Sequence, residues 1–236
     1  MIASQYAMGT NHPDLVRMNR WFWVLSKPMK DLTLPLFSFL SGRKINLAAK
    51  EIFQDIHIED LWLPFFCVST NLTLASAVIH RRGLLLNAIR ASCAVPGLVP
   101  PVIQNNEILV DGGIMNNMPV EIARGLFKGK VIAVDVTDAR VLSTLRQEFP
   151  SKGNYQGTGY AGKNRQSIPG ILDIIYRSAV AGSRQNTEKA AQNADLSLRI
   201  PLDQFKFLDL INLMRSLTGY QYGKKKIQAW KDTWNQ

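Results

Sequence analysis

Cysteine is nearly absent from the sequence: its 236 residues include only Cys67 and Cys93. Both stand in apolar stretches, and neither belongs to a C-x-x-C pair or to a zinc-binding pattern of cysteine and histidine. This scarcity excludes a disulfide-stabilised scaffold. We predict two reduced, buried thiols, no metal ion and no cofactor.

Long apolar runs are lacking as well. The longest uncharged run, residues 61–80, has about the length of a membrane span. Pro64 and Asn71 interrupt it, which favours two strands joined by a polar turn. The first residues contain no basic stretch followed by an apolar one, as a signal peptide would. These absences predict an intracellular protein that contacts membranes only at their surface.

Acidic residues are in deficit. The sequence has 28 lysines and arginines against 18 aspartates and glutamates, which gives a net charge of +10. Such an excess favours an anionic partner, either a phospholipid surface, a nucleic acid or an acidic protein. The charge is dispersed, and its tightest clusters are residues 224–226 and the pair Arg81 and Arg82. Because no nucleic-acid-binding motif accompanies it, an anionic membrane surface ranks first and nucleic acid ranks low.

Strand-like and helix-like segments alternate along the chain, which predicts an α/β fold in one domain over residues 1–236. Strands are expected at residues 63–69, 75–80, 107–110, 131–136 and 195–200. The fourth is an almost continuous β-branched run, typical of a strand buried on both faces. Helices are expected at residues 1–8, 13–25, 46–54, 119–127, 168–193 and 220–234. The glycine-rich residues 151–167 predict an exposed loop or a lid.

The candidate chemistry lies at Asp111. This residue is predicted to follow the end of a strand, and Gly112 and Gly113 come directly after it. In open α/β sheets, reacting groups gather just past the carboxyl ends of strands. Two glycines allow a sharp turn there, and the carboxylate can accept a proton from a neighbouring group. An Asp-Gly pair alone is also typical of a plain turn, so it does not assign a catalytic role.

A longer block gives this aspartate its context. Residues 87–101 read Asn-Ala-Ile-Arg-Ala-Ser-Cys-Ala-Val-Pro-Gly-Leu-Val-Pro-Pro, and residues 108–120 read Ile-Leu-Val-Asp-Gly-Gly-Ile-Met-Asn-Asn-Met-Pro-Val. Together with residues 58–72, this block resembles the patatin-like phospholipase family, and within it the neuropathy target esterase branch. The resemblance covers nearly the whole chain.

The resemblance implies a patatin-like three-layer α/β/α domain with a mostly parallel central sheet. It also implies a carboxylic ester hydrolase that acts on lysophospholipids and phospholipids through a serine–aspartate dyad. In that dyad Asp111 would be the proton acceptor, and Gly112 and Gly113 would complete its motif. Arg90 and Gly97 match the segment before the motif, where the resemblance implies a structural role.

The sequence departs from the family in one respect. The family's nucleophile stands in G-x-S-x-G, and an upstream glycine-rich loop stabilises the oxyanion. Neither is present: even Ser4, the serine nearest the expected place, has no glycine two residues away. We expect the serine just before Met1, so that residues 1–236 form the C-terminal portion of a domain without its N-terminal strands. The chain alone is then expected to be inactive.

Histidine is also scarce after the aspartate. His12, His57 and His80 all precede Asp111, whereas a triad of the α/β-hydrolase type needs a histidine after its acid. A serine–aspartate dyad needs none, so we predict structural roles for all three.

Two alternatives stay open at this stage. The chain is either part of a lipid hydrolase or a non-catalytic protein that docks on anionic membranes or regulates a full-length relative. The aromatic and apolar residues 21–40 fit two roles. They could cover an acyl chain or touch a lipid interface, or they could pack as the core of a helix pair.

Overall fold

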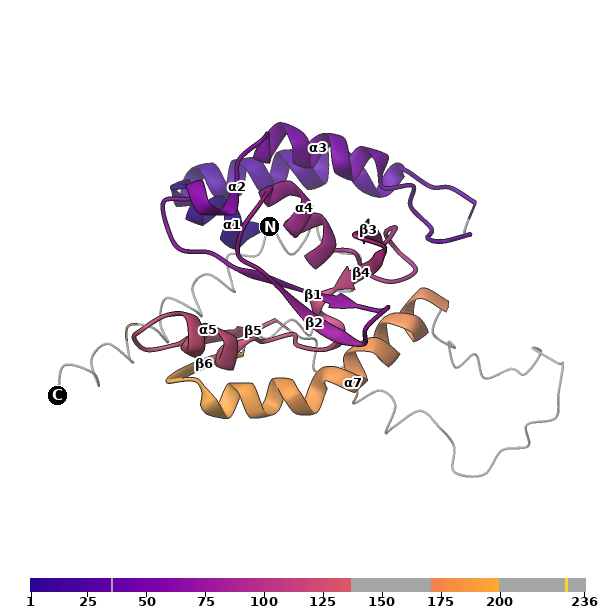
Figure 1. Cartoon of the computed structure of the whole chain (residues 1–236). Helices are drawn as coiled ribbons and strands as arrows, with labels where there is room; N and C mark the ends of the chain where they lie inside the picture. Colours follow the sequence, from indigo (N-terminus) through magenta and orange to yellow (C-terminus); the bar gives the residue numbers. More distant parts are fainter. Residues whose placement is uncertain (35, 137–170, 200–227, 229–236) are drawn as a thin grey trace, which may run out of the picture.

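The computed structural model describes residues 1–34, 36–136, 171–199 and 228, arranged as helical layers on both sides of β-structure (Figure 1). Four helices lie on one side of a four-stranded sheet: α1 (Ile2–Ala7), α2 (His12–Arg20), α3 (Arg43–Phe53) and α4 (Leu85–Ser92). The helices α5 (Val120–Leu126) and α7 (Ile171–Asn193) lie on the other side, next to a two-stranded sheet. The expected α/β class is confirmed.

The four-stranded sheet has the order β2-β1-β4-β3, and every pair in it is antiparallel. Its strands are β1 (Cys67–Asn71), β2 (Ser76–His80), β3 (Val102–Gln104) and β4 (Glu107–Asp111). The second sheet pairs β5 (Ile132–Asp135) in parallel with β6 (Leu196–Arg199). The sequence predicted a mostly parallel sheet. The described strands are instead partly antiparallel, because all pairs of the four-stranded sheet are antiparallel and only β5 and β6 run parallel.

Two tight turns explain two of the three antiparallel pairs, β1 with β2 and β3 with β4. In the first, the Asn71 side chain accepts hydrogen bonds from the backbone N–H groups of Thr73 and Leu74, which closes the hairpin of β1 and β2. In the second, Asn105 and Asn106 both have positive φ, the backbone of a two-residue hairpin turn between β3 and β4. Strands joined this closely cannot run parallel.

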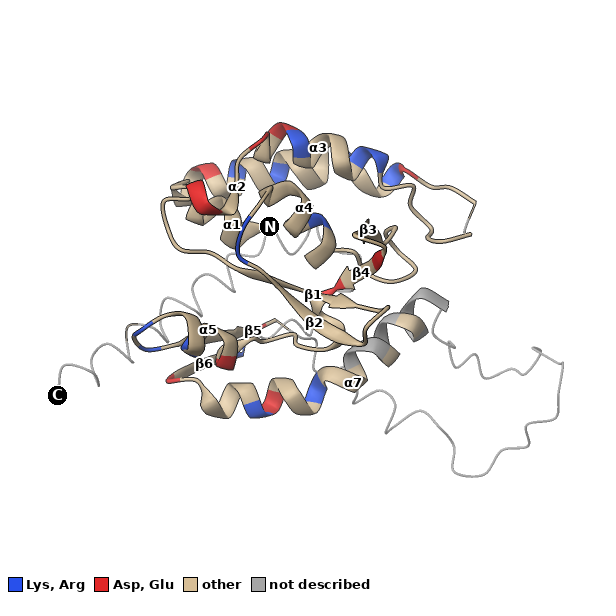
Figure 2. Cartoon of the chain, in the orientation of Figure 1, with Lys and Arg blue, Asp and Glu red and all other residues tan. Residues whose placement is uncertain are grey.

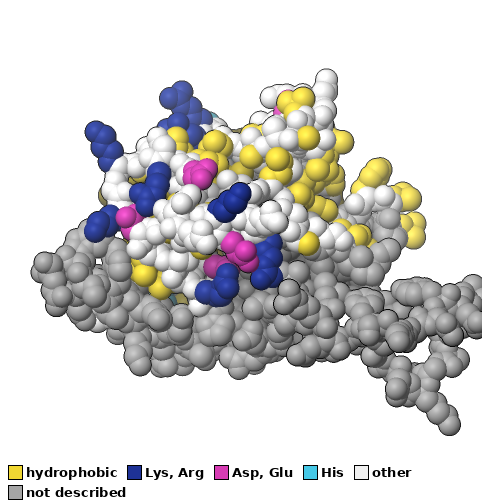
Figure 3. Space-filling view, turned by 90° about the horizontal axis from the view of Figure 1, so that it is seen from below, with side chains coloured by type: hydrophobic (Ala, Val, Ile, Leu, Met, Phe, Trp, Pro, Cys, Tyr) yellow, Lys and Arg dark blue, Asp and Glu magenta, His cyan; other side chains and the backbone are white. Residues whose placement is uncertain are grey.

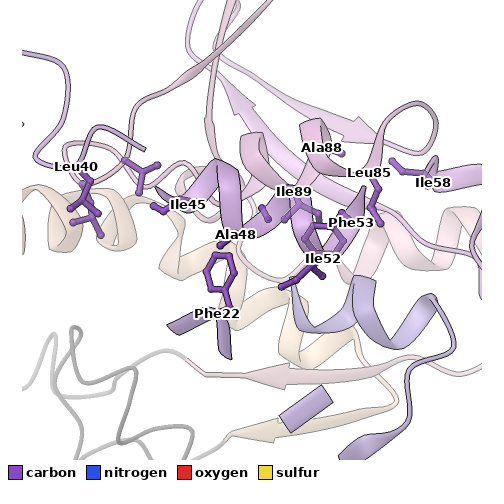
Figure 4. Packing of buried hydrophobic residues seen from close by; sticks show 13 residues of the cluster. Phe22, Leu40, Ile45, Ala48, Ile52, Phe53, Ile58, Leu85, Ala88 and Ile89 are labelled. Atoms are coloured by element: carbon purple, nitrogen blue, oxygen red, sulfur yellow. The ribbon is translucent and has the colours of Figure 1, made fainter. Parts of the chain in front are cut away.

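The main core lies among α3, α4 and the aromatic segment that follows α2, on one side of the four-stranded sheet (Figure 4). Phe22, Phe53 and Leu85 are almost completely buried there. The apolar side chains of α3 recur on one face of the helix, and they pack against α4 and against the aromatic segment that follows α2. Burial of each such side chain contributes about 1.5–3 kcal/mol to folding. This core holds α4 and the strands beside it in place.

Most expected elements form within a few residues of their predicted bounds. The predicted helix at residues 13–25 is confirmed, but its second half, Trp21–Leu25, is a π-helical turn. Helix α4 was not predicted. The strand at residues 131–136 was predicted to be buried on both faces, which is wrong for the part of the sheet that is described. There β5 alternates, with Ile132 and Val134 exposed. Residues 151–167 lie outside the described residues, as do residues 220–234 apart from residue 228, and with them the cluster 224–226.

Candidate active site

Asp111 is the last residue of β4 and lies opposite Ser69 of β1. Its backbone N–H donates to the carbonyl oxygen of Ala94, at 3.0 Å. Its carboxylate oxygen Oδ1 accepts the backbone N–H of Gly113, at 2.7 Å. The carboxylate therefore caps the short 3₁₀ turn η4 (Gly112–Ile114) through this oxygen.

Burial raises the pKa of Asp111 above its ordinary value of 3.8. The Gly113 hydrogen bond and the positive charge of the Met1 amino group lower the pKa, but by less than burial raises it. The raised pKa makes Asp111 a stronger base than an aspartate in water. The Met1 amino group also hydrogen-bonds to the Cys93 thiol, so the amino end of α1 lies next to Cys93 and within electrostatic reach of Asp111.

The two glycines after Asp111 meet different surroundings. A Cβ added at Gly112 would overlap the carbonyl group of Val68, whose carbon would lie only 2.8 Å away. A Cβ at Gly113 would lie 3.1 Å from Asp111 Oδ1 and 3.2 Å from Asn117 Oδ1. Those oxygens belong to side chains that can shift. The structure therefore requires glycine at Gly112 but only favours it at Gly113.

A serine–histidine contact lies beside the candidate aspartate. Ser69 Oγ and His80 Nε2 share a hydrogen bond of 2.7 Å between β1 and β2. Ser69 is completely buried, so its hydroxyl is shielded from a substrate in solution. Burial lowers the pKa of His80, which favours the neutral ring. The sequence analysis missed this contact, because only the strand register brings the two residues together.

The Ser69→Ala variant is expected to lower the free energy of unfolding by about 1–3 kcal/mol, because His80 would lose its buried partner. Urea unfolding followed by circular dichroism measures the change. Ser197→Ala, on the exposed face of β6, is the control and should change little. Equal effects of the two variants would show that the Ser69–His80 hydrogen bond does not stabilise the fold.

The structure also places Arg90 and the two cysteines, which the sequence analysis singled out. Arg90 donates from Nε to the Asn46 side chain, which ties α4 to α3, in line with its expected structural role. Both cysteines are free; Cys67 is half-buried, and burial raises its pKa to about 12. Cys93 is exposed on one side, so the prediction that both thiols are buried is wrong for it.

The described segments hold neither a candidate metal site nor a candidate membrane span. They contain no cluster of three or more histidine, cysteine or carboxylate side chains placed to share a metal ion. In the same segments, no helix combines the length and the apolar character that crossing a membrane requires.

A comparison of the sequence with known families identifies the part of the chain that contains Asp111. The profile described as patatin-like phospholipase matches residues 10–124, a range that includes Asp111 and both of its glycines. The chain belongs to the patatin-like phospholipase family. The predicted resemblance is thereby confirmed.

Individual relatives point to the expected branch of the patatin-like phospholipases. The chain is 33% identical to human patatin-like phospholipase domain-containing protein 6 over 210 residues, which is 86% of this chain and 15% of the relative. It is 33% identical to lysophospholipase NTE1 of Mycosarcoma maydis over 85% of this chain and 11% of the relative. It is 29% identical to neuropathy target esterase sws of Drosophila melanogaster over 90% of this chain and 15% of the relative. The chain thus spans only 11–15% of the length of these relatives.

Proposed function

We propose that this chain supplies the catalytic base of a lipid acyl hydrolase, with Asp111 as the proton acceptor of a serine–aspartate dyad. The substrate class is a lysophospholipid or phospholipid presented at an anionic membrane surface. The observation that carries the proposal is the carboxylate at the end of β4. The Gly113 N–H group orients this carboxylate, burial raises its pKa, and the amino end of α1 lies within electrostatic reach of it.

The nucleophile of this proposal is a serine in a G-x-S-x-G motif, which the 236 residues do not contain. The positive charge of the Met1 amino group lowers the pKa of Asp111, so the amino end of α1 lies within electrostatic reach of the carboxylate. The family's nucleophile occupies a turn directly before a helix. The position of α1 therefore supports a serine just before residue 1.

The reaction follows from the free oxygen of the carboxylate. The serine hydroxyl gives its proton to the Asp111 oxygen that Gly113 does not occupy, and the serine oxygen attacks the ester carbonyl. The carbon–oxygen bond to the glycerol part then breaks, and that oxygen takes the proton from Asp111. Water next gives a proton to Asp111 and attacks the acyl-serine. The fatty acid leaves, and the proton returns to the serine oxygen.

A longer version of the polypeptide tests the proposal. The version that begins upstream of residue 1 and includes an in-frame G-x-S-x-G motif is expected to release fatty acid from lysophosphatidylcholine. It should also react covalently with a fluorophosphonate probe. Replacement of the motif serine by alanine, or expression of residues 1–236 alone, should leave only background activity. The proposal fails if no such motif precedes residue 1, or if residues 1–236 hydrolyse the lipid as fast as the longer version.

The missing G-x-S-x-G motif itself favours a second candidate, a non-catalytic protein that binds anionic membranes or regulates a full-length relative. This candidate predicts that residues 1–236 bind anionic vesicles, and that Asp111→Asn changes neither vesicle binding nor the activity of a longer version. Nucleic acid remains a low-ranking partner, and an electrophoretic shift assay across a salt series tests it.

A further inference from the structure

Residues 31–34 and 36–41, called the finger below, project beyond the first turn of α3 (Figure 1). Four large apolar side chains of the finger are among the most exposed of the described residues: Leu32, Leu34, Leu36 and Phe37, with exposed fractions of 76–82%. Scattered single apolar side chains are normal on a protein surface, but four on one projecting loop are a patch.

The finger is held by hydrogen bonds at its base. The Asp31 carboxylate accepts from the Ser41 hydroxyl at 2.6 Å and from the backbone N–H of Lys44 at 2.9 Å. The Ser41 backbone N–H donates to the Asp31 carbonyl at 2.8 Å, and the Thr33 N–H donates to the Phe39 carbonyl at 3.0 Å. These contacts join the two arms, so the exposure of the tip belongs to a defined conformation.

The returning arm connects the finger to the candidate active site. The Phe39 N–H donates to the Gly97 carbonyl at 2.8 Å, and the Leu40 N–H donates to the Leu98 carbonyl at 3.0 Å. Three residues before Gly97, the Ala94 carbonyl accepts the N–H of Asp111. One short segment, residues 94–98, therefore hydrogen-bonds both to the returning arm of the finger and to Asp111.

Positive charge surrounds the base of the finger. Four exposed basic residues flank it: Lys27, Lys30, Arg43 and Lys44. Asp31 is the only acidic residue in residues 15–50, and its charge is used in the contacts at the base. Figure 2 shows the basic residues at the start of α3, where the finger meets the helix. On the face seen in Figure 3, apolar side chains gather on one part and basic side chains on another.

We propose that the finger docks the protein on an anionic phospholipid membrane, with its apolar tip in the acyl region and the basic residues at the headgroups. An apolar tip with basic residues at its base matches the two layers of a membrane interface, because apolar burial and attraction to anionic lipid act together there. A second protein is the weaker occupant, since a specific protein interface uses about 20–30 residues a side. The proposal rests on the proposed function, whose substrate is a membrane lipid.

Vesicle binding tests the finger directly. The chain is mixed with vesicles of phosphatidylcholine, with or without phosphatidylserine, and sedimented across a series of NaCl concentrations. The variant Leu36→Asp/Phe37→Asp places charge at the tip. Leu72→Asp/Leu74→Asp adds the same charge to the exposed turn between β1 and β2, which is far from the finger in the sequence, and serves as the matched control.

The tip variant is expected to bind phosphatidylserine vesicles at least ~10-fold more weakly, while the control binds nearly as the unmodified chain does. Binding of the unmodified chain should weaken as NaCl rises. Melting temperatures should agree among the three proteins, because all four positions are exposed. Equal vesicle binding by the tip variant and the unmodified chain would overturn the proposal. Light scattering measures whether the tip variant changes the molar mass of the protein. If the mass changes while vesicle binding does not, the finger contacts a second copy of the chain, and membrane docking is overturned.

Hydrolysis separates this proposal from the proposed function. In the version that includes G-x-S-x-G, the tip variant should keep its activity on a water-soluble short-chain ester and lose activity on vesicle lipid. Full activity of the tip variant on both substrates refutes membrane docking by the finger and does not contradict the proposed serine–aspartate dyad. Full activity of Asp111→Asn on the soluble ester refutes the dyad, whatever the finger does.

Discussion

Asp111→Asn is expected to lower kcat/KM for lysophospholipid by about 10²–10⁴-fold in the polypeptide that includes the nucleophile, because an amide cannot accept the serine proton. The amide oxygen can still accept the Gly113 N–H, so the turn should keep its shape. Release of fatty acid at steady state measures the loss.

In the unmodified enzyme, the rate should fall as the pH drops through the Asp111 pKa, which lies above the ordinary 3.8. A rate that stays constant down to pH 3.8 would contradict the assignment.

The same substitution is expected to raise the melting temperature near neutral pH. Burial raises the folded-state pKa of Asp111, so the ionised carboxylate opposes folding once the pH exceeds that pKa. Asparagine carries no charge and removes this opposition. Below the unfolded-state pKa of about 3.8, both proteins are neutral at residue 111 and their melting temperatures should converge. A variant that melts lower than the unmodified protein at neutral pH would show that the carboxylate is not held against a desolvation penalty.

Asp195→Asn is the control for this test, and the expected sign of its effect on stability is opposite. The Asp195 carboxylate accepts from Arg124 at 2.8 Å and from the backbone N–H of Val131 at 2.8 Å, far along the chain from Asp111. The Val131 hydrogen bond, with the nearby Arg124, lowers its pKa. Its stabilising effect is present above the unfolded pKa and is lost as the pH falls through the folded pKa. The substitution should lower the melting temperature at neutral pH and leave kcat/KM unchanged.

Local sequence signals predicted the centre of the site. The strand that ends at Asp111 and the turn at Gly112 and Gly113 both form as expected, because a strand end and a glycine turn are specified within a few neighbouring residues. The helices also form near their predicted places, since their apolar periodicity is local. The catalytic assignment of Asp111 came from the resemblance to the family, and it stays a prediction.

Features that depend on contacts between distant residues were not predicted. The Ser69–His80 hydrogen bond exists because the register of β1 and β2 sets the two residues diagonally across the hairpin. The polar turn at Asn71 was predicted, but strand β3 and the turn at Asn105 and Asn106 that pairs it with β4 were not. Two alternative roles were left open for residues 21–40, core packing or contact with lipid, and the structure divides the segment between buried and exposed parts. Phe22 packs in the core, whereas Phe37 at the other end is exposed.

Gly112, next to the candidate catalytic aspartate, packs closely against the backbone of β1. Gly112→Ala is expected to lower the free energy of unfolding by about 3 kcal/mol or more, because its Cβ would meet the backbone carbonyl of Val68 in β1. A strand backbone in the middle of a sheet cannot move aside as a side chain can. Relief of the overlap would shift either β1 or the turn that orients Asp111. Ester hydrolysis should therefore fall together with stability, and urea unfolding with fatty-acid release measures both.

Gly113→Ala is the matched control, because the same methyl group is added one residue later. Its Cβ would meet only the ends of the Asp111 and Asn117 side chains, at 3.1 and 3.2 Å, and a shift of a few tenths of an ångström relieves both contacts. We expect this variant to fold and to keep most of its activity. Its remaining loss should be in kcat rather than stability, because one of the two displaced groups is the Asp111 carboxylate. If both alanine variants lose stability equally, the close approach of Gly112 to Val68 does not explain why glycine stands there.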